Sequence, residues 1–274
     1  MARSADHILD PDGRQYHIGL KAGEVAPRVL LVGDPARADR VASRFENVRL
    51  TRRHREYVTH TGTWCGLDVT VMATGIGCDN TEIAVLELLQ CERKPVLVRV
   101  GSCGALQPGV QPGDVAISTG ALRLEATSAG FVEDAFPAVA HHEVVLAQLS
   151  AAAHLGVRHH LGLTATAAGF YGWQGRTEGV IPSRMPDLPE RLAAQGVLNL
   201  EMEASTLFVL AQLAQVRAGA VCAVFANRRA NAFIADDEKG AAEDRAISVG
   251  LTTLLFLEQM DRRRPGGHFV LEHP

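Results

Sequence analysis

The stretch RVLLVGDPARADRVASRF at residues 28–45 indicates the fold class, because it places an apolar strand directly before a helix. A strand is predicted over residues 28–33, and its run of aliphatic residues without polar alternation is typical of a strand covered on both faces. Asp34 is a suitable N-cap and Pro35 suits the first helical position, so a helix is predicted over 36–45. A strand followed by a capped helix is the repeating unit of α/β proteins.

The same alternation continues along the rest of the chain. Further strands are predicted at 69–74, 96–101, 115–122, 161–167, 197–200 and 219–226, and further helices at 80–91, 142–155, 203–215 and 237–260. This pattern predicts a single α/β domain over 16–260, with a mixed, barrel-like central sheet flanked by helices. The polar segment 1–15 and the Arg-, Pro- and Gly-containing segment 261–274 are expected to be flexible.

Composition argues against several classes of protein. The 274 residues include 27 Lys or Arg and 31 Asp or Glu, and the net charge of −4 argues against a nonspecific nucleic-acid binder. No window offers the roughly 18 uninterrupted apolar residues of a membrane span, and the polar start does not predict a secretory signal. The five cysteines are odd in number and form no CxxC pair, so neither a disulfide scaffold nor a structural zinc site is expected. We therefore expect a cytoplasmic protein without nucleic-acid or membrane partners.

Arg99 interrupts the apolar run LVRVG at 97–101. An unpaired buried charge is costly, so an anionic partner is expected beside it. That partner is either an acidic side chain or a bound phosphate or carboxylate, and the strand alone does not distinguish them. The following GSCG at 101–104 predicts a turn whose backbone amides and Ser102 hydroxyl face an anion, although a plain tight turn has the same sequence.

The strand at 28–33 ends in a similar way, with Arg37 in the first turn of a helix whose N-terminus attracts anions. Ligands of α/β sheets gather at the carboxyl ends of strands. Gly33, Arg37, Arg99 and Ser102 together therefore form a candidate phosphate cradle from two strand ends. The alternative for Arg37 is a capped helix with a solvated arginine. Guanidinium groups scattered in solvent, or paired with acidic side chains, would overturn the cradle and any enzymatic function built on it.

Glu201 and Glu203 precede an apolar helix, which makes them candidates for binding a sugar. If both are helical, their side chains point about 200° apart, so one could face a pocket while the other pairs elsewhere. A buried carboxylate is a good acceptor for the vicinal hydroxyls of a ribose. The alternative is acidic charge favoured by the helix dipole.

Residues 169–176, GFYGWQGR, combine glycines with aromatic side chains. In an extended segment Gln174 and Arg176 share a side, and a carboxamide beside a guanidinium can bind a carbonyl–NH–carbonyl edge such as that of uracil. Phe170 or Tyr171 could cover a flat ring. Arg228, at the end of the strand 219–226, adds positive charge nearby. The alternatives are a surface loop with a hydrophobic plug and a solvated basic turn.

In their order along the chain, these segments closely resemble the nucleoside phosphorylases of the uridine phosphorylase type. The resemblance runs from about Tyr16 to Leu257 and is highly specific as an ordered set, although each motif alone is weak. It is carried by YHIGL at 16–20, GDPAR at 33–37, HREY at 54–57, TGIG at 74–77, RVGSCG at 99–104, GDV at 113–115, Phe170-Tyr171 with Gln174 and Arg176, GVLNLEME at 196–203 and Asn227-Arg228.

The resemblance implies reversible phosphorolysis of uridine to uracil and ribose 1-phosphate, with phosphate as co-substrate and no organic cofactor. It implies a distorted mixed barrel and a homohexamer, a trimer of dimers with shared active sites. The implied phosphate-binding residues are Gly33, Arg37, Arg99, Ser102 and, from the neighbouring subunit, Arg55. The implied ribose-binding residues are Met202, Glu203 and, from the neighbour, His17. The implied base-binding residues are Phe170, Gln174, Arg176, Glu201 and Arg228. Catalysis is expected to depend most on Arg37, Arg99, Gln174, Arg176 and Glu203.

The chain also departs from the family pattern. Gly172-Trp173 replaces a proline–glycine pair, Leu200 replaces a frequent tyrosine, and Ser102 replaces a threonine. Asn80 replaces a serine that, with Glu56 and Ile76, holds a monovalent cation in some relatives, so the sequence leaves that cation open.

Related purine enzymes carry an aspartate near Asn227–Arg228, and its absence here favours a pyrimidine substrate. Several alternatives stay open: deoxyuridine or thymidine as the nucleoside, a purine phosphorylase, a nucleosidase that uses water, and a non-catalytic nucleoside-binding protein.

Overall fold

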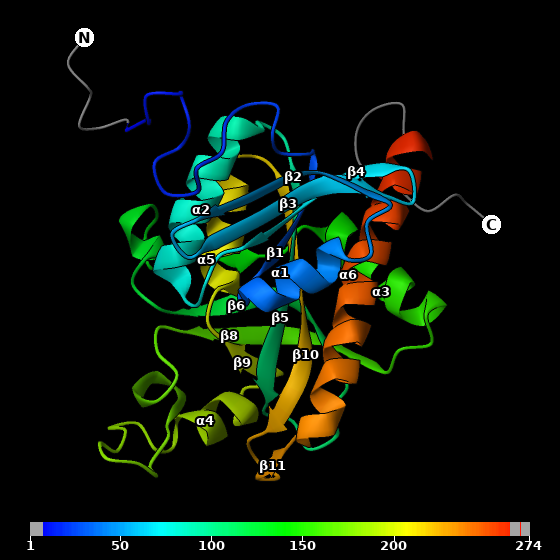
Figure 1. Ribbon diagram of the computed structural model, residues 1–274. Coiled ribbons are helices and arrows are strands. Elements are labelled where there is room, and N and C mark those ends of the chain that lie inside the picture. The colour runs from blue at the N-terminus through cyan, green and yellow to red at the C-terminus, as the bar shows by residue number, and fades with distance from the viewer. Residues whose placement is uncertain (1–7, 264–268, 270–274) are drawn as a thin grey trace.

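The computed structural model describes residues 8–263 and 269, which form one α/β domain (Figure 1). Residues 1–7, 264–268 and 270–274, where flexible ends are predicted, lie outside the described residues. The described part of the predicted flexible segment 1–15 has a tertiary contact, since Arg14 pairs with Glu24 at 2.5 Å. Residues 261–263, at the start of the second predicted flexible segment, form the last turn of a long helix, and the flexibility of the segment stays a prediction. Arg217 holds that turn through Asp261, at 2.7 Å.

A single mixed sheet organises the described chain. Its strands are β1 (Arg28–Val32), β2 (Asn47–His54), β3 (Tyr57–Trp64), β4 (Leu67–Ala73), β5 (Val96–Ala105), β6 (Val115–Leu124), β7 (Ala138–Val139), β8 (His159–Ala167), β9 (Asn199–Glu201), β10 (Arg217–Asn227) and β11 (Ala232–Phe233). Strands β5, β10, β6, β8 and β9 close into a ring, because β10 pairs with both β5 and β6 while β9 pairs with both β8 and β5. The remaining long strands extend the sheet from β5 in the order β1, β4, β3, β2. The predicted barrel-like mixed sheet is therefore confirmed.

Helices cover both faces of the part of the sheet around β1 (Figure 1). They are α1 (Pro35–Ala42), α2 (Cys78–Cys91), α3 (His142–His154), α4 (Leu188–Ala194), α5 (Ala204–Leu213) and α6 (Asp236–Arg263), with short 3-10 turns η1 (Ser128–Gly130) and η2 (Gly172–Gln174). Alternate residues of β1 face opposite layers, as strand geometry requires. Leu30 and Val32 join the core shared with α1, α3 and α6, and Val29 and Leu31 join the core shared with α2 and α5.

The predicted turn at 101–104 is wrong, because β5 continues through it to Ala105. Pairing with β10 keeps this segment extended, with Gly101 opposite Cys222 and Gly104 opposite Ala226. The glycine at 101 has a steric reason. A Cβ there would lie 2.8 Å from the Arg99 guanidinium and 3.0 Å from the Cys222 sulfur.

Several elements were not predicted. They are β2, β3, β7, β11 and α4. Strand β2 lies at the end of the sheet and is mostly exposed, so its sequence NVRLTRRH lacks the apolar pattern that marks the buried strands. No helix among the described residues is long and apolar enough to cross a membrane.

Candidate active site

One cavity of about 820 Å³ brings together most of the predicted site residues. Those that line it are Gly33, Arg37, Arg99, Ser102, Phe170, Gln174, Arg176, Glu201, Met202 and Glu203. Sequence reasoning missed Phe225 and Phe233, which also line it, because the short strand β11 that carries Phe233 left no recognisable pattern. Residues more than 160 positions apart in the chain thus share one cavity.

Helix α1 positions Arg37 at the cavity. The Asp34 carboxylate accepts a hydrogen bond from the Ala36 N–H at 2.9 Å, which confirms the predicted N-cap, and Pro35 occupies the first turn. The buried Arg37 guanidinium donates to Glu243 at 2.7 Å and to the Val100 carbonyl at 3.3 Å. Its Nε is buried and has no hydrogen-bond partner among the residues that the structure describes.

Glu243 also begins a ladder of ion pairs between α1 and α6. Its second oxygen accepts from Arg40 at 3.0 Å, Arg40 donates to Asp244 at 2.7 Å, and Asp244 accepts from Arg44 at 2.5 Å. The ladder fixes one face of α1 against the long C-terminal helix. Of its arginines, Arg37 is the one that lines the cavity.

Arg99 lies between two buried carboxylates. Its Nε donates to Glu201 at 3.1 Å, and its Nη2 donates to Glu203 in a short contact. Burial opposes the charge of Arg99, but the carboxylates of Glu203 and Glu201 outweigh it and raise the pKa of Arg99. The expected divergence of the two glutamates is wrong. Glu201 ends β9 and Glu203 is the N-cap of α5 with φ −143°, so neither is helical and both converge on one guanidinium.

Glu201 is fully engaged by hydrogen-bond donors. One carboxylate oxygen accepts from the Thr166 hydroxyl at 2.6 Å, and the other accepts from Arg99 and from the Glu203 N–H at 2.9 Å. The Ala204 N–H donates to both oxygens, at 3.0 and 3.1 Å. Although Glu201 lines the cavity, this geometry suits it to hold the surrounding groups in place.

Glu203 has fewer partners and a perturbed charge. The Gly77 N–H at the start of α2 donates to one oxygen at 2.7 Å, and Arg99 donates to the other. Burial raises the pKa of Glu203 above its ordinary value, with Glu201 adding to the effect and Arg99 opposing it. The ionised form of Glu203, at the cavity wall, is therefore less favoured than that of a glutamate in water.

The segment that carries Gln174 and Arg176 is not extended. Gln174 lies in the 3-10 turn η2, and Gly175 follows with φ +65°, in the left-handed region that favours glycine. Both side chains still line the cavity. Arg176 donates to the Phe170 carbonyl at 3.0 Å, and its guanidinium carbon lies 3.9 Å from the Phe170 ring centroid. Burial, and then repulsion from Arg228, lower the pKa of Arg176.

Arg228 does not line the cavity itself. Its Nη1 donates to the Gln174 carbonyl at 3.0 Å, so it supports the loop from behind. The neighbouring Asn227 is buried at the end of β10: its amide donates to the carbonyls of Gln107 and Val110, and its oxygen accepts from the Arg229 and Ala230 amides. Its carboxamide is thus committed to the backbone.

His17 and Arg55 lie outside the cavity of their own chain. His17 Nδ1 is 2.6 Å from Glu87, and the Arg55 guanidinium carbon lies 4.7 Å from the ring centroid of Tyr16. The resemblance assigns both residues to a neighbouring subunit, and that assignment stays a prediction.

The residues proposed for a monovalent cation share the cavity. Glu56, Ile76 and Asn80 all line it, and a Cβ at Gly75 would lie 2.7 Å from the Asn80 amide nitrogen and 3.8 Å from Glu56 Cγ. The carboxylate and carboxamide therefore flank one glycine. Their oxygen atoms are the kind of ligand that a hard monovalent cation takes.

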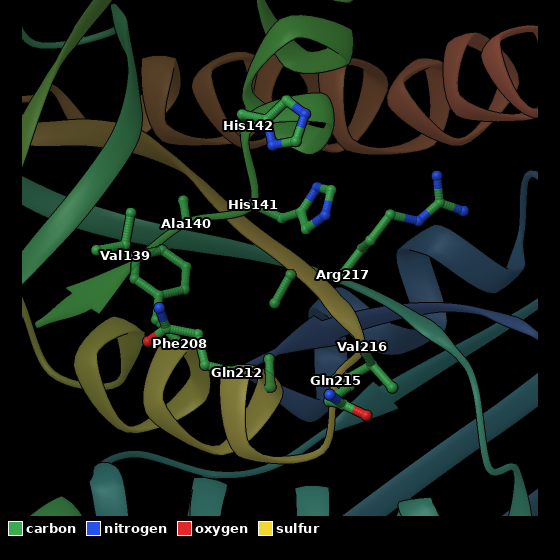
Figure 2. A pocket seen from close by; sticks show the side chains of 11 residues that line it. Val139, Ala140, His141, His142, Phe208, Gln212, Gln215, Val216 and Arg217 are labelled. Atoms are coloured by element: carbon green, nitrogen blue, oxygen red, sulfur yellow. The ribbon is translucent and has the colours of Figure 1, made fainter. Parts of the chain in front are cut away.

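A second cavity of about 580 Å³ contains none of the predicted site residues. It lies where α5 leads into β10, and Figure 2 shows His141, Gln212 and Arg217 around it. Arg217 pairs there with Glu143 at 3.0 Å and with Asp261 at 2.7 Å. An arginine with two acidic partners thus lines each cavity, and Arg99 is buried whereas Arg217 is only partly buried.

Arg37 and Arg99 both have acidic partners, the outcome that was expected to overturn an enzymatic function built on the cradle, so the arginines alone do not identify the site. The comparison with known proteins is more decisive. Residues 27–253 match the family model of the phosphorylase superfamily. The chain belongs to this superfamily.

Members of the phosphorylase superfamily with known activities align over most of the chain. The uridine phosphorylase of Thermococcus kodakarensis is 47% identical over 241 residues, which cover 87% of each chain. That of Treponema pallidum is 37% identical over 250 residues, 91% of this chain and 96% of the relative. A guanosine phosphorylase of Halorubrum lacusprofundi is 32% identical over 231 residues, 84% of this chain and 89% of the relative. The resemblance seen in the sequence is confirmed.

Proposed function

We propose that the chain is a pentosyltransferase that catalyses the reversible phosphorolysis of uridine to uracil and ribose 1-phosphate, in pyrimidine nucleoside salvage. One observation carries the proposal: a single cavity contains the cationic groups of α1 and β5 together with the carboxamide and guanidinium of the loop at 170–176. The relatives support uridine as the nucleoside, because two of them are uridine phosphorylases that align over most of this chain.

Phosphate is proposed to lie against Gly33, Arg37, Arg99 and Ser102. The acidic partners orient the two arginines: Glu201 and Glu203 engage Nε and Nη2 of Arg99, and Glu243 engages Arg37. Guanidinium groups fixed in this way hold an anion without reorganising when the reaction occurs. The buried Nε of Arg37 would gain its first partner from a phosphate oxygen.

In the proposed reaction, the bond between C1′ of the sugar and N1 of uracil breaks ahead of attack. The bonding electron pair leaves with uracil, and the sugar becomes oxocarbenium-like. A phosphate oxygen then bonds to C1′. Met202 and Glu203 would hold the ribose, with the Glu203 carboxylate accepting from its hydroxyls.

The departing uracil carries negative charge over O2, N3 and O4. Gln174 and Arg176 would stabilise this charge more in the transition state than in the ground state, so no general acid is required. For Arg228 and Glu201, assigned to base binding from the sequence, we propose a supporting role instead, because Arg228 donates to the Gln174 carbonyl and Glu201 accepts from Arg99.

Replacement of Arg176 by alanine tests this stabilisation of the leaving group. We expect Arg176→Ala to lower kcat for uridine by about 10²–10³, the usual effect of removing one donor to a developing anion. The measurement is steady-state uracil release at saturating phosphate. A normal rate in the folded variant would contradict the proposed role.

A substrate panel tests the function itself. Uridine, deoxyuridine, thymidine, inosine and guanosine are each incubated with and without phosphate, and the free base and pentose 1-phosphate are measured. We expect uridine to be cleaved only with phosphate. Cleavage in water alone would indicate a nucleosidase, and no cleavage of any substrate would indicate a binding protein.

One comparison favours the alternative that the chain is a purine nucleoside phosphorylase. A guanosine phosphorylase is among the relatives, but Asn227 cannot donate a proton as an aspartic acid can, and its amide is committed to Gln107 and Val110. Faster cleavage of guanosine or inosine than of uridine would overturn the pyrimidine assignment.

We further propose a cytoplasmic homohexamer, a trimer of dimers, in which His17 and Arg55 complete a neighbour's site. Two observations support the shared site: both residues lie outside their own cavity, and Ile76 at its wall is 70% exposed. The five cysteines are unpaired, which suits a reducing compartment. A monovalent cation would be held by Glu56, Ile76 and Asn80. Sedimentation of the purified protein tests the assembly.

A further inference from the structure

Thr166 lies directly behind the candidate active site. It belongs to β8, is fully buried, and does not line the cavity. Its hydroxyl oxygen is 2.6 Å from a carboxylate oxygen of Glu201 and 2.9 Å from the backbone nitrogen of Ser205. Thr166 therefore connects the barrel strand to two groups at the start of α5.

The direction of these hydrogen bonds is fixed by chemistry. The Ser205 N–H can only donate, so it uses a lone pair of the Thr166 oxygen. The single hydroxyl hydrogen of Thr166 is then free to point at Glu201, in a charge-assisted bond whose short length is typical of a carboxylate acceptor. A hydroxyl held in this way restricts the rotation of the Glu201 carboxylate.

Glu201 in turn holds the two groups proposed to act on the substrate. It accepts from Arg99 Nε at 3.1 Å and from the backbone N–H of Glu203 at 2.9 Å. A rotation of its carboxylate would shift the plane of the Arg99 guanidinium and loosen the turn at residues 202–204. Thr166 is therefore two hydrogen bonds, through Glu201, from both Arg99 and the Glu203 N–H.

We propose that Thr166 is a positioning residue for phosphorolysis: its hydroxyl fixes the Glu201 carboxylate and thereby the Arg99 guanidinium that receives phosphate. This inference rests on the proposed function of Arg99. Thr166 touches neither phosphate nor nucleoside. Its effect is transmitted through Glu201.

Thr164 offers a matched control on the same strand. It precedes Thr166 by two residues, so its side chain leaves the same face of β8, and it is equally buried. Its hydroxyl bonds to Ser118 at 2.6 Å and to the Asn199 side-chain oxygen at 2.9 Å. Within the described part of the chain, neither partner is hydrogen-bonded to Arg99, whose carboxylate partners are Glu201 and Glu203, so we expect loss of this hydroxyl to disturb the barrel interior without reaching the proposed phosphate site.

The experiment compares Thr166→Val, Thr166→Ser and Thr164→Val in the full-length protein. For each variant, kcat and the KM values for phosphate and uridine are measured, and binding of inorganic phosphate is measured by calorimetry without nucleoside. We expect Thr166→Val to raise both the KM and the Kd for phosphate about tenfold, the scale of one hydrogen bond to a charged group. Thr166→Ser and Thr164→Val should stay within about twofold of the unaltered protein.

An unchanged phosphate Kd in Thr166→Val would overturn the proposal, as would an equal loss in Thr164→Val. If Thr166→Val does not fold, Thr166→Cys gives the same comparison with a much weaker donor. The calorimetric arm separates this inference from the proposed function. A protein that binds phosphate in a Thr166-dependent way but cleaves no nucleoside supports the positioning role and refutes the phosphorylase function.

Discussion

Arg99 and Arg217 lie on neighbouring parallel strands, and each is bracketed by two carboxylates, yet they line different cavities. The register places Arg217 opposite Val96, where β5 begins, and Arg99 opposite Ala220, further along both strands. Arg99 is thus the closer of the two to the carboxyl ends, where ligands of α/β sheets bind. Position along the strands, rather than the ion pairing itself, distinguishes the candidate site.

The surroundings of the two arginines also differ. The side chains of Arg99 and its partners are almost completely buried, whereas Asp261 beside Arg217 is 35% exposed. Solvent therefore screens the Arg217 cluster more strongly. Burial opposes the charge of both arginines, and in both the acidic partners prevail and raise the pKa. The Arg99 cluster is the one in which a small change of geometry has a large electrostatic effect.

The largest expected difference comes from replacing each arginine by lysine. Arg99→Lys keeps the charge but loses the planar fork that bonds Glu201 and Glu203 and is proposed to bind phosphate, so we expect kcat/KM for phosphate to fall about 10²–10³. Arg217→Lys should leave the activity of the folded protein within about twofold, because Arg217 lines the other cavity. Steady-state kinetics and urea unfolding of both variants make the comparison. Equal losses of activity would remove the distinction between the two clusters.

A smaller effect is expected from neutralising one acid in each cluster. Burial raises the pKa of Glu203, so the ionised form needed to accept from ribose is lost at a pH above the ordinary glutamate range. We expect the acid limb of kcat/KM for uridine to lie above pH 4.5, and Glu203→Gln to lack this limb and to lose about tenfold or more in kcat/KM. The matched variant Asp261→Asn should retain the limb.

The sign for stability is the opposite of the sign for activity. Since the folded-state pKa of Glu203 exceeds its unfolded value, protonation of this group favours the folded state as the pH falls through the raised pKa. For activity, an acid limb of kcat/KM for uridine that persists in Glu203→Gln would show that another group titrates.

At each arginine-bearing strand, one glycine allows a helix to pack closely against the strand. Replacing these glycines is expected to have the next largest effect. A methyl group at Gly250 of α6 would overlap the Val100 side chain beside Arg99, and one at Gly219 of β10 would overlap Val144 of α3. We expect Gly250→Ala and Gly219→Ala each to lower the free energy of unfolding by about 1–3 kcal/mol. Chemical denaturation measures this. Only Gly250→Ala should also raise the KM for phosphate, because it displaces the strand that carries Arg99.

The smallest effect is expected away from both clusters, in the turn between β3 and β4. Cys65 has φ +48° and Gly66 has φ +72°, which fits a two-residue hairpin turn that prefers Asn-Gly. We expect Cys65→Asn to stabilise the protein by about 0.5 kcal/mol, with unchanged kinetics. Thermal unfolding checks the first expectation. A destabilised variant would show that the exposed thiol has a packing role.

The sequence predicted the apolar elements well and the polar ones poorly, and β3, with the sequence YVTHTGTW, was missed although it is mostly buried. Apolar runs at β1, β5 and β10 and the capping residues Asp34 and Pro35 revealed the α/β alternation, because burial on both faces leaves a continuous pattern. Strand β2 was not predicted, because an exposed strand at the edge of a sheet needs no continuous apolar pattern. The segment at 101–104 was misjudged because Gly101 serves a close approach of Arg99 and Cys222 inside a strand, not a turn.

The sequence predicted which residues line the cavity more fully than it predicted how they are arranged. Local pattern showed that Arg99 needed an anionic partner, but two carboxylates separated from it by about 100 residues could be paired with it only after folding. The same limit applies to Arg37, whose partner Glu243 comes 206 residues later. Sequence spacing also could not show that Arg228 supports Gln174 through its backbone carbonyl.

The bond between Arg37 and Glu243 has a consequence for the timing of biosynthesis. The first strand and helix leave the ribosome early, but the carboxylate that orients Arg37 is in α6, and β10, which closes the ring beside Arg99, also comes late. Contacts of such long sequence separation form late in folding. A nascent chain therefore has no finished pocket until most of α6 has emerged, so truncated translation products lack the assembled site.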